Sequence, residues 1–180
     1  PPGLKTYLTD ESESVPDNFF FADTASDKKI IEGLFGTKVF EFPKSLELIK
    51  HLISLCTKNN DIILDFFSGS ATTAHAVMQL NADDGGNRKF LMIQLPEPCS
   101  EDSEAYKAGF TNICEIGKER IRRAGEKIKD EYKDKEGIEN LDTGFQVFKL
   151  DTSNLKTWDT DVEELEETLK GMVDPIKEDR

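Results

Sequence analysis

A short apolar run that leads directly into a loop of small residues constrains this chain more than any other feature. Residues 61–66 (DIILDF) are typical of a strand buried on both faces of a parallel sheet. A Ser/Gly/Thr loop follows at 68–73, and a helix is expected from Thr73 to about Leu80. Turn residues at 81–87 then lead into a second apolar run at 90–95, which Pro96 ends. Strand, loop, helix, turn and strand in this order predict a βαβ unit.

Further elements are expected on both sides of this unit. Ser45 is a good helix N-cap, and apolar residues recur at helical spacing after it. The expected elements are a short helix at 28–36, a short strand or extended segment at 39–42, helices at 45–57 and 111–132, an edge strand at 144–150 and a final helix after Thr160. They predict an α/β fold with helices on both faces of the sheet. The core domain is 28–150, between an acidic irregular segment at 1–27 and an acidic helical segment at 151–180.

Charge and cysteine content narrow the classes of function. The net charge is −13, and most of it lies at the ends: residues 1–27 carry −5 and residues 151–180 carry −6. An acidic surface is a poor match for DNA phosphates. The cysteines, Cys56, Cys99 and Cys114, form no CxxC pair, which disfavours a disulfide framework or a zinc site and favours the cytoplasm. The start of the chain is no signal peptide, and we expect it to lie inside a longer protein.

The loop at 68–73 is suited to a ligand that carries both charges. Gly69 allows close approach to the backbone, and Thr72 and Thr73 lie where a helix N-terminus favours an anion. Asp65, at the carboxyl end of the strand, favours a cation. S-adenosylmethionine carries a carboxylate and an ammonium group. The loop lacks both the GxGxxG and the GxxxxGK patterns. On spacing alone, a merely polar connection remains an open alternative.

The sequence around this loop resembles a known family. Residues 65–77 (DFFSGSATTAHAV) resemble the cofactor motif DxFxGSGTT of the β-class amino-methyltransferases, with Ala71 in place of a glycine. Further stretches resemble the modification subunits of type III restriction-modification systems, at 40–45, 74–78, 84–90, 94–97 and 144–151. The resemblance extends over residues 4–158. It implies a partial Rossmann-like methyltransferase sheet that binds S-adenosyl-L-methionine. Because alanine disfavours positive φ, we expect a slightly tighter pocket at Ala71.

The resemblance also implies roles for individual residues. The residues expected at the methionine end are Asp65, Phe66, Phe67, Gly69 and Ser70, with Thr72 and Thr73 near the carboxylate. Those expected to close the pocket are Phe42, Pro43, Lys44 and Ser45. Glu97 is the candidate for the ribose hydroxyls, because a carboxylate can accept two hydrogen bonds, and Gln94 is the competing candidate.

The implied activity is site-specific methylation of adenine N6 in DNA. The family's catalytic motif, Asp-Pro-Pro-Tyr or a close variant, precedes the cofactor motif and is absent from this chain. We therefore assign no catalytic residue and expect the chain to be inactive alone. The implied partners are DNA, a second modification subunit and a helicase-nuclease restriction subunit. The alternatives are a non-catalytic cofactor-binding or subunit-interaction module, and, less favoured by the resemblance, a small-molecule methyltransferase.

Other conspicuous side chains receive a structural interpretation. His51 and His75 are expected to be packed or solvated, Cys99 is not expected to be a nucleophile, and no metal ligands are assigned. The aromatic run at 19–21 is interpreted as a packing plug. A basic group on the long helix is interpreted as a solvated face rather than a DNA contact: Lys118, Arg120, Arg122, Arg123, Lys127 and Lys129.

Overall fold

The structure, a computed structural model, describes residues 19–22 and 24–151. The chain divides into two units, 1–144 and 145–180. All helices and strands of the described residues lie in the first unit: α1 (Thr24–Phe35), α2 (Leu46–Cys56), β1 (Ile62–Asp65), α3 (Thr72–Asp84), β2 (Lys89–Met92), α4 (Glu104–Lys107), α5 (Ile113–Glu131) and the 3-10 turn η1 (Ile138–Asn140). The fold is therefore mixed α/β, as predicted.

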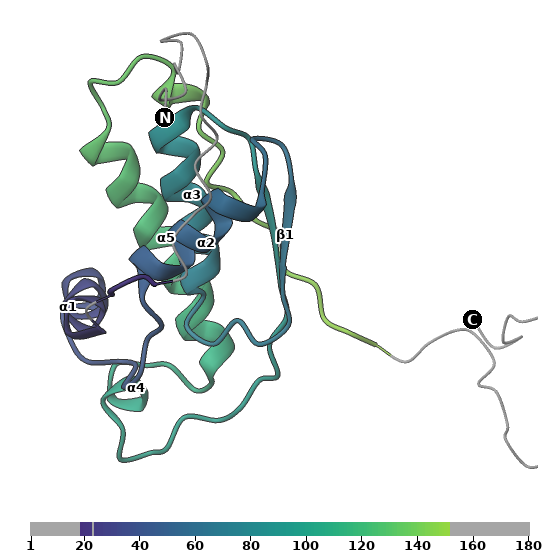
Figure 1. The fold of residues 1–180 in the computed structure, drawn as a ribbon. Helices are drawn as coiled ribbons and strands as arrows, with labels where there is room; N and C mark the ends of the chain where they lie inside the picture. Colours follow the sequence, from purple (N-terminus) through teal and green to yellow (C-terminus); the bar gives the residue numbers. More distant parts are fainter. Residues whose placement is uncertain (1–18, 23, 152–180) are drawn as a thin grey trace, which may run out of the picture. The chain divides into compact units, whose positions relative to one another are not determined.

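The predicted βαβ unit is confirmed. β1 and β2 pair in parallel, with Ile62 opposite Lys89 and Asp65 opposite Met92, and α3 connects them. α3 runs further than expected, to Asp84, and ends where Gly85 adopts a left-handed conformation with φ of 72°. Both strands and their connection can be followed in Figure 1.

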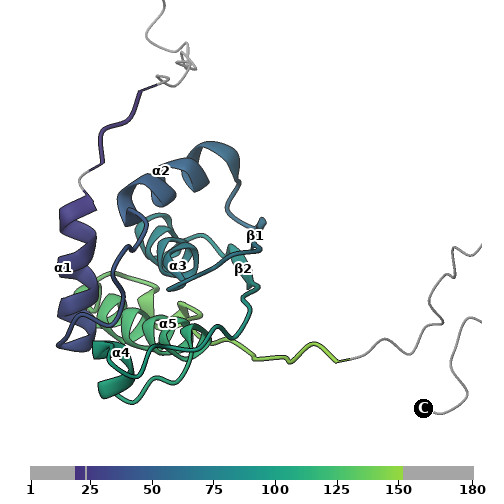
Figure 2. The same ribbon diagram turned by 90° about the horizontal axis from the view of Figure 1, so that it is seen from below.

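The helices form a core on one side of the sheet. Ile63 of β1 and Phe90 of β2 pack against a buried cluster from α2 and α3 that consists of Leu46, Ile53, Ala76, Val77 and Leu80. α3 lies between α2 and α5, as Figure 2 shows, which explains why most of its residues are buried. Ser45 caps α2 as predicted, since its hydroxyl accepts a hydrogen bond from the Leu48 N–H at 3.3 Å.

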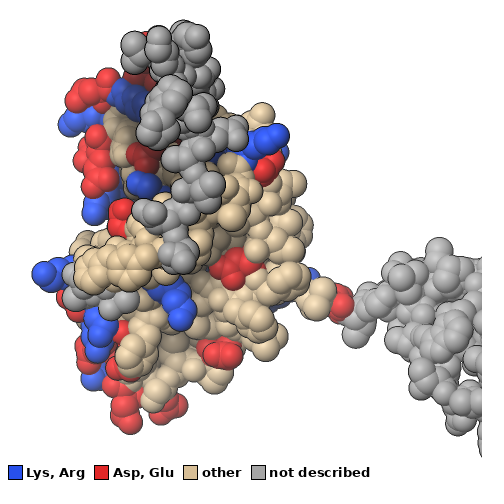
Figure 3. Space-filling view, in the orientation of Figure 1, with Lys and Arg blue, Asp and Glu red and all other residues tan. Residues whose placement is uncertain are grey.

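The other face of the sheet is exposed, which corrects the prediction that both strands are buried on both faces. The exposed fractions of Ile62, Leu64 and Leu91 are 63%, 48% and 55%. Within the described residues, helices cover only the opposite face. Figure 3 shows a largely uncharged surface on this side, whereas charged side chains gather over the helices. An apolar run indicates that both faces avoid water, but it does not say which part of a protein covers each face.

One predicted strand is wrong. Residues 144–150 form no strand, and α1 begins at Thr24 rather than at Lys28. Residues 39–42, predicted as a short strand or extended segment, belong to no strand. An alternating pattern fits a pleated strand, but a strand also needs a hydrogen-bonded neighbour. In the described part of the chain, the paired strands and the isolated bridge include neither segment. The long helix is confirmed as α5, with Ile116, Ile121, Ala124 and Ile128 buried. The helix expected after Thr160 lies outside the described residues.

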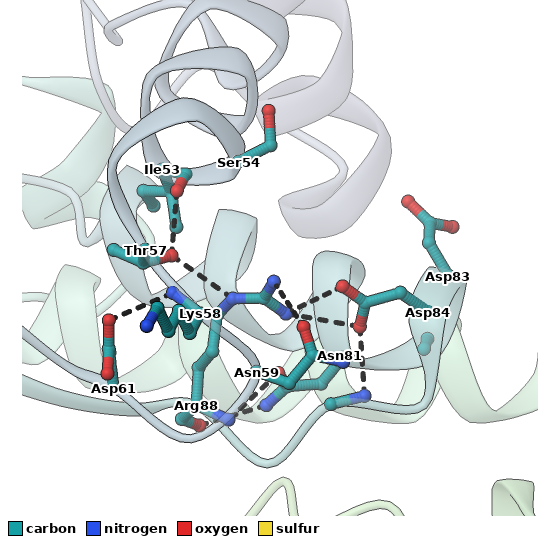
Figure 4. A network of polar contacts seen from close by, with 12 residues as sticks. Ile53, Ser54, Thr57, Lys58, Asn59, Asp61, Asn81, Asp83, Asp84 and Arg88 are labelled. Carbon is teal, nitrogen blue, oxygen red and sulfur yellow. Dashed lines mark hydrogen bonds and ion pairs between the residues drawn. The ribbon is translucent and has the colours of Figure 1, made fainter. Parts of the chain in front are cut away.

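The turn between α3 and β2 is held by a buried arginine. Arg88 is 6% exposed, and its guanidinium contacts three side chains from two segments, the end of α3 and the residues after α2, as Figure 4 shows. It forms an ion pair with Asp84 at 2.8 Å and donates hydrogen bonds to Asn59 Oδ1 and Thr57 Oγ1, each at 3.2 Å. The Arg88 N–H donates to the side-chain oxygen of Asn81, and the side-chain nitrogen of Asn81 donates to the Arg88 carbonyl oxygen. The network fixes the point at which β2 begins.

Candidate functional site

A hollow of about 250 Å³ lies beyond the carboxyl end of β1. Its walls are the loop that leads into α3 and the segment that leads into α2. The predicted residues that line it are Phe42, Lys44, Asp65, Phe67, Gly69, Ser70, Thr72 and Thr73. Phe40, Ile49 and Ser68 also line it and were not predicted. Two sequence segments that the resemblance assigned to one pocket are therefore brought together by the fold.

Asp65 is held in place by neutral donors. Its Oδ1 accepts a hydrogen bond from the Phe67 N–H at 3.1 Å, and its Oδ2 accepts one from the Thr73 hydroxyl at 2.6 Å. In the part of the chain that the structure describes, no Lys or Arg forms an ion pair with Asp65. Its oriented negative charge is thus available to a cationic group in the hollow.

The turn at Gly69 uses a backbone conformation that favours glycine. Gly69 has a φ of 51°, which L side chains rarely adopt, although a Cβ placed on it would lie at an ordinary contact distance of 3.8 Å from the Phe40 ring. Its N–H donates to Gln94 Oε1 at 2.8 Å, which ties the loop to the residues after β2. Gln94 does not line the hollow, so in this structure it supports the loop. The resemblance had made it a candidate for direct contact with the ribose.

Ala71 adopts a strained backbone conformation. Its φ of 60° and ψ of 41° are left-handed, and it is the one non-glycine residue with positive φ among the described residues. As the N-cap residue of α3 it provides no side-chain cap. The first N–H groups of α3 therefore lack the usual partner and are available to an anion.

Arg120 is a part of the site that the sequence interpretation missed. It was grouped with a solvated basic face, but its exposed fraction is 0%. Its Nη1 donates to Ser70 O, Ser70 Oγ and Thr72 Oγ1 at 3.3, 2.9 and 2.7 Å. Helical spacing was the available signal, because Arg120 follows Ile116 by four residues on the inward side of α5. Arg122, Lys127 and Lys129 are exposed, as that interpretation expected.

Several predicted residues do not reach the hollow. Pro43 and Ser45 are buried behind the wall, with Ser45 engaged as the cap of α2. Phe66 is 60% exposed outside the lining. Glu97 is also exposed, and its backbone oxygen accepts a hydrogen bond from the Ile113 N–H. Any contact of these side chains with a ligand requires the ligand to extend beyond the hollow.

Two further titratable side chains, His75 and Cys99, have pKa values that burial shifts. Burial lowers the pKa of His75 to about 3, and the charges of Arg120, Lys127 and Lys50 act in the same direction. Burial raises the pKa of the Cys99 thiol, and Glu115 adds to the effect. His51 stacks on Phe20 at 4.4 Å, whereas Phe19 and Phe21 are exposed. In the described residues no cluster of metal ligands occurs, and no helix is long and apolar enough to cross a membrane.

Comparison with known proteins identifies the family. Residues 5–126 match the family model of the DNA methylases, so the chain belongs to the DNA methylase family. It is 39% identical over 151 residues to the Mod subunit of the type III restriction-modification enzyme StyLTI of Salmonella typhimurium. It is 43% identical over 97 residues to the Mod subunit of the type III enzyme EcoPI of Escherichia phage P1. The resemblance to type III modification subunits is confirmed.

The likeness extends to a type II enzyme and covers only part of each relative. The chain is 39% identical over 114 residues to the type II methyltransferase M.KpnI of Klebsiella pneumoniae. These alignments include 82% of the chain for StyLTI, 63% for M.KpnI and 54% for EcoPI. They include 22%, 27% and 15% of those relatives. The chain therefore spans about a quarter or less of the relatives it matches.

Proposed function

We propose that the chain binds S-adenosyl-L-methionine in the hollow beside β1, as the cofactor-binding part of a DNA adenine-N6 methyltransferase. The observation that supports this is the opposite polarity of two groups at one hollow. Asp65 offers an oriented carboxylate with no ion pair in the described residues, and α3 begins without a side-chain cap. The ammonium group of the ligand would pair with Asp65 and its carboxylate with the α3 N-terminus.

The size of the hollow suits one end of this ligand. Its 250 Å³ lies below the roughly 300–1,000 Å³ of complete small-molecule sites. We assign the methionine end to the hollow and the adenosine to the surface next to it. Phe42 and Phe67, which are 75% and 87% exposed on the rim, offer apolar area to the adenosine. In this arrangement Glu97 remains the proposed acceptor for the ribose hydroxyls, with Gln94 as the competing candidate.

The complete reaction requires more than this chain. We propose that the full-length protein transfers the sulfonium methyl group to adenine N6 within a short DNA sequence. The DPPY-type motif that would hold the flipped adenine is absent here, so methyl transfer by the chain alone is not expected. The proposed partners are DNA, a second modification subunit and a restriction subunit. The free cysteines Cys56, Cys99 and Cys114 are in keeping with the cytoplasm.

The exposed face of the sheet fits the same proposal. Parallel sheets normally have both faces covered. The apolar side chains of Ile62, Leu64 and Leu91 would then be covered by further parts of the full-length protein, which would complete a Rossmann-like sheet with helices on both faces. The same face supports the second candidate function, a subunit-interaction module without catalysis, because an exposed apolar patch is also suited to a partner chain.

Isothermal titration with S-adenosyl-L-methionine tests the cofactor site. Asp65→Asn keeps the size of the side chain but removes its charge, and we expect binding at least about tenfold weaker. Asp61→Asn is the matched control, because Asp61 lies at the other end of β1 and caps the turn at Lys58. Equal affinity in both variants, or no binding by the full-length gene product, would contradict the proposed site.

A methyl-transfer assay separates the two candidate functions. The chain and the full-length gene product are each incubated with adenine-containing duplex DNA and labelled cofactor. Transfer by the full-length product and none by the chain is the expected result. Transfer by the chain alone would contradict its assignment as a non-catalytic part. No transfer by a full-length product that binds the cofactor would favour the interaction module.

A further inference from the structure

Two buried charged residues behind the hollow hold its two walls. We propose that Arg120 of α5 and Asp27 of α1 are positioning residues: Arg120 fixes the loop before α3, Asp27 fixes the start of α2, and together they set the geometry in which a ligand carboxylate is bound. Neither residue lines the hollow. The role of Arg120 in carboxylate binding rests on the proposed function, whereas the positioning of the walls does not.

Arg120 holds the loop wall from behind. Its side chain is fully buried, and one nitrogen, Nη1, donates to Ser70 O, Ser70 Oγ and Thr72 Oγ1. These acceptors lie on both sides of Ala71, the residue with the strained left-handed backbone. A strained conformation persists only where its surroundings fix it. Three hydrogen bonds from a charged donor to the residues before and after Ala71 provide such fixation.

Asp27 holds the opposite wall in the same way. It is 2% exposed, and its Oδ1 accepts a hydrogen bond from the Leu46 N–H at 2.7 Å. Leu46 is the first residue of α2 and follows directly on the wall segment that carries Phe42 and Lys44. A carboxylate at a helix N-terminus is favourable. Asp27 thereby fixes the position at which this wall ends and α2 begins.

The two charges compensate each other. Burial lowers the pKa of Arg120 to about 10, and the charge of Asp27 acts in the opposite direction. Within the described residues, Asp27 Oδ2 and Arg120 Nε have no hydrogen-bond partner. Opposite charges stabilise each other in a low-dielectric interior. One of the two residues is bonded to each wall, so each wall has its own buried charged support.

The position of Arg120 also makes a prediction about the ligand. A guanidinium bonded to Ser70 and Thr72 places a positive charge behind the N-terminus of α3. The guanidinium charge and the N-terminus of α3 each favour an anionic group in front of the helix. The contribution of Arg120 to affinity should therefore depend on the carboxylate of the ligand. Decarboxylated S-adenosylmethionine keeps the ammonium and sulfonium groups and lacks only this carboxylate, so it is the appropriate comparison.

Titration of the full-length gene product with both ligands tests this role. In Arg120→Gln we expect S-adenosylmethionine to bind about tenfold more weakly, and the decarboxylated ligand to change less than about threefold. Arg120→Lys keeps the charge and should therefore retain part of the preference of the wild type for S-adenosylmethionine over the decarboxylated ligand. Arg122→Gln, with a side chain that is 56% exposed two residues along α5, is the control and should match the wild type. Equal weakening of both ligands by Arg120→Gln would overturn the proposed carboxylate dependence.

Hydrogen exchange without ligand tests the positioning of the walls. Arg120→Gln should raise amide exchange about tenfold in residues 70–73, and Asp27→Ala should do so at residues 46–48, while exchange in β2 stays unchanged. Asp27→Asn keeps an acceptor for the Leu46 N–H and should restore part of the protection there. A uniform rise over the whole chain, or no rise at either wall, would overturn the proposal. If the wild type binds no S-adenosylmethionine, the proposed function fails while this measurement still decides the positioning role.

Discussion

Ala71 and Gly117 lie directly against each other where the loop before α3 meets α5. A Cβ placed on Gly117 would stand 3.6 Å from the Ala71 Cβ and 3.3 Å from the Gly69 carbonyl oxygen. The family motif has glycine at the position of Ala71. In this chain the loop instead carries the methyl group of Ala71, and the facing residue of α5, Gly117, has no side chain. Ala71 is 2% exposed, which means that the contact is closed to water.

Gly117→Ala should therefore destabilise the protein even though alanine favours helices. Overpacking typically costs about 1–3 kcal/mol, and alanine gains up to about 1 kcal/mol over glycine in a helix. We expect the free energy of unfolding in urea to fall by about 1 kcal/mol. Gly33→Ala in α1 is the matched control, since no atom lies within 4 Å of its added Cβ, and it should be neutral or stabilising.

The double variant of Gly117→Ala and Ala71→Gly tests the contact itself. Removal of the Ala71 Cβ takes away a contact at ordinary van der Waals distance and relieves the left-handed strain, so that the loop with the Gly69 oxygen, 3.3 Å from the new Cβ, is free to shift. The two substitutions should then be coupled by more than about 0.5 kcal/mol in a double-mutant cycle. Additive effects would mean that the two residues do not limit each other.

Thr73→Val should weaken cofactor binding without unfolding the protein. Valine has nearly the same shape as threonine but lacks the hydroxyl that donates to Asp65 Oδ2 at 2.6 Å. Asp65 is then less well oriented toward an ammonium group, and we expect the Kd for S-adenosylmethionine to rise about 3- to 10-fold. Thr73→Ser retains the hydroxyl and should bind nearly as the wild type does. If valine and serine bind alike, the hydrogen bond has no role in orienting Asp65.

His75 should make stability depend on pH in a range where carboxylates titrate little. Its pKa is about 6.5 in the unfolded chain and about 3 in the folded protein. Stability is therefore fully present above pH 6.5 and is lost progressively as the pH falls toward 3, because only the unfolded chain takes up the proton. Between pH 7 and pH 5 we expect a loss of about 2 kcal/mol. In urea unfolding, the free energy of unfolding of His75→Leu should depend much less on pH than that of the wild type. An unchanged pH dependence would rule out His75 as its source.

Arg88→Met should lower stability without affecting the loop at the hollow. The substitution removes the bonds to Thr57, Asn59 and Asp84. We expect a loss of about 2–3 kcal/mol in urea unfolding, because the three acceptors lose their buried charged donor. Lys89→Met, at the adjacent exposed position, should change stability by less than about 0.5 kcal/mol. A similar loss in both variants would indicate that the start of β2, rather than the network, is sensitive.

Local sequence patterns were enough to locate the βαβ unit and the cap at Ser45. These features depend on neighbours in the chain: the apolar runs, the turn at Gly85 and the hydroxyl of Ser45 act within a few residues. The predicted strand at 144–150 was wrong because pairing depends on a second segment, which a local pattern cannot supply. For the same reason the exposure of Ile62 and Leu64 was not foreseen.

The sequence by itself determined the loop of the site, since Asp65, Gly69 and Thr73 lie on one short segment between a strand and a helix. Only the tertiary structure decided what supports that loop and the opposite wall of the hollow. Gln94 was a candidate for the ribose, yet in the structure it contacts Gly69. Asp27 and Arg120 were not site candidates, yet both are buried behind the hollow. Burial and hydrogen bonding of a charged side chain depend on every segment packed around it. The packing of α5 against α3 and of α1 against α5 is what converts Arg120 and Asp27 into internal supports.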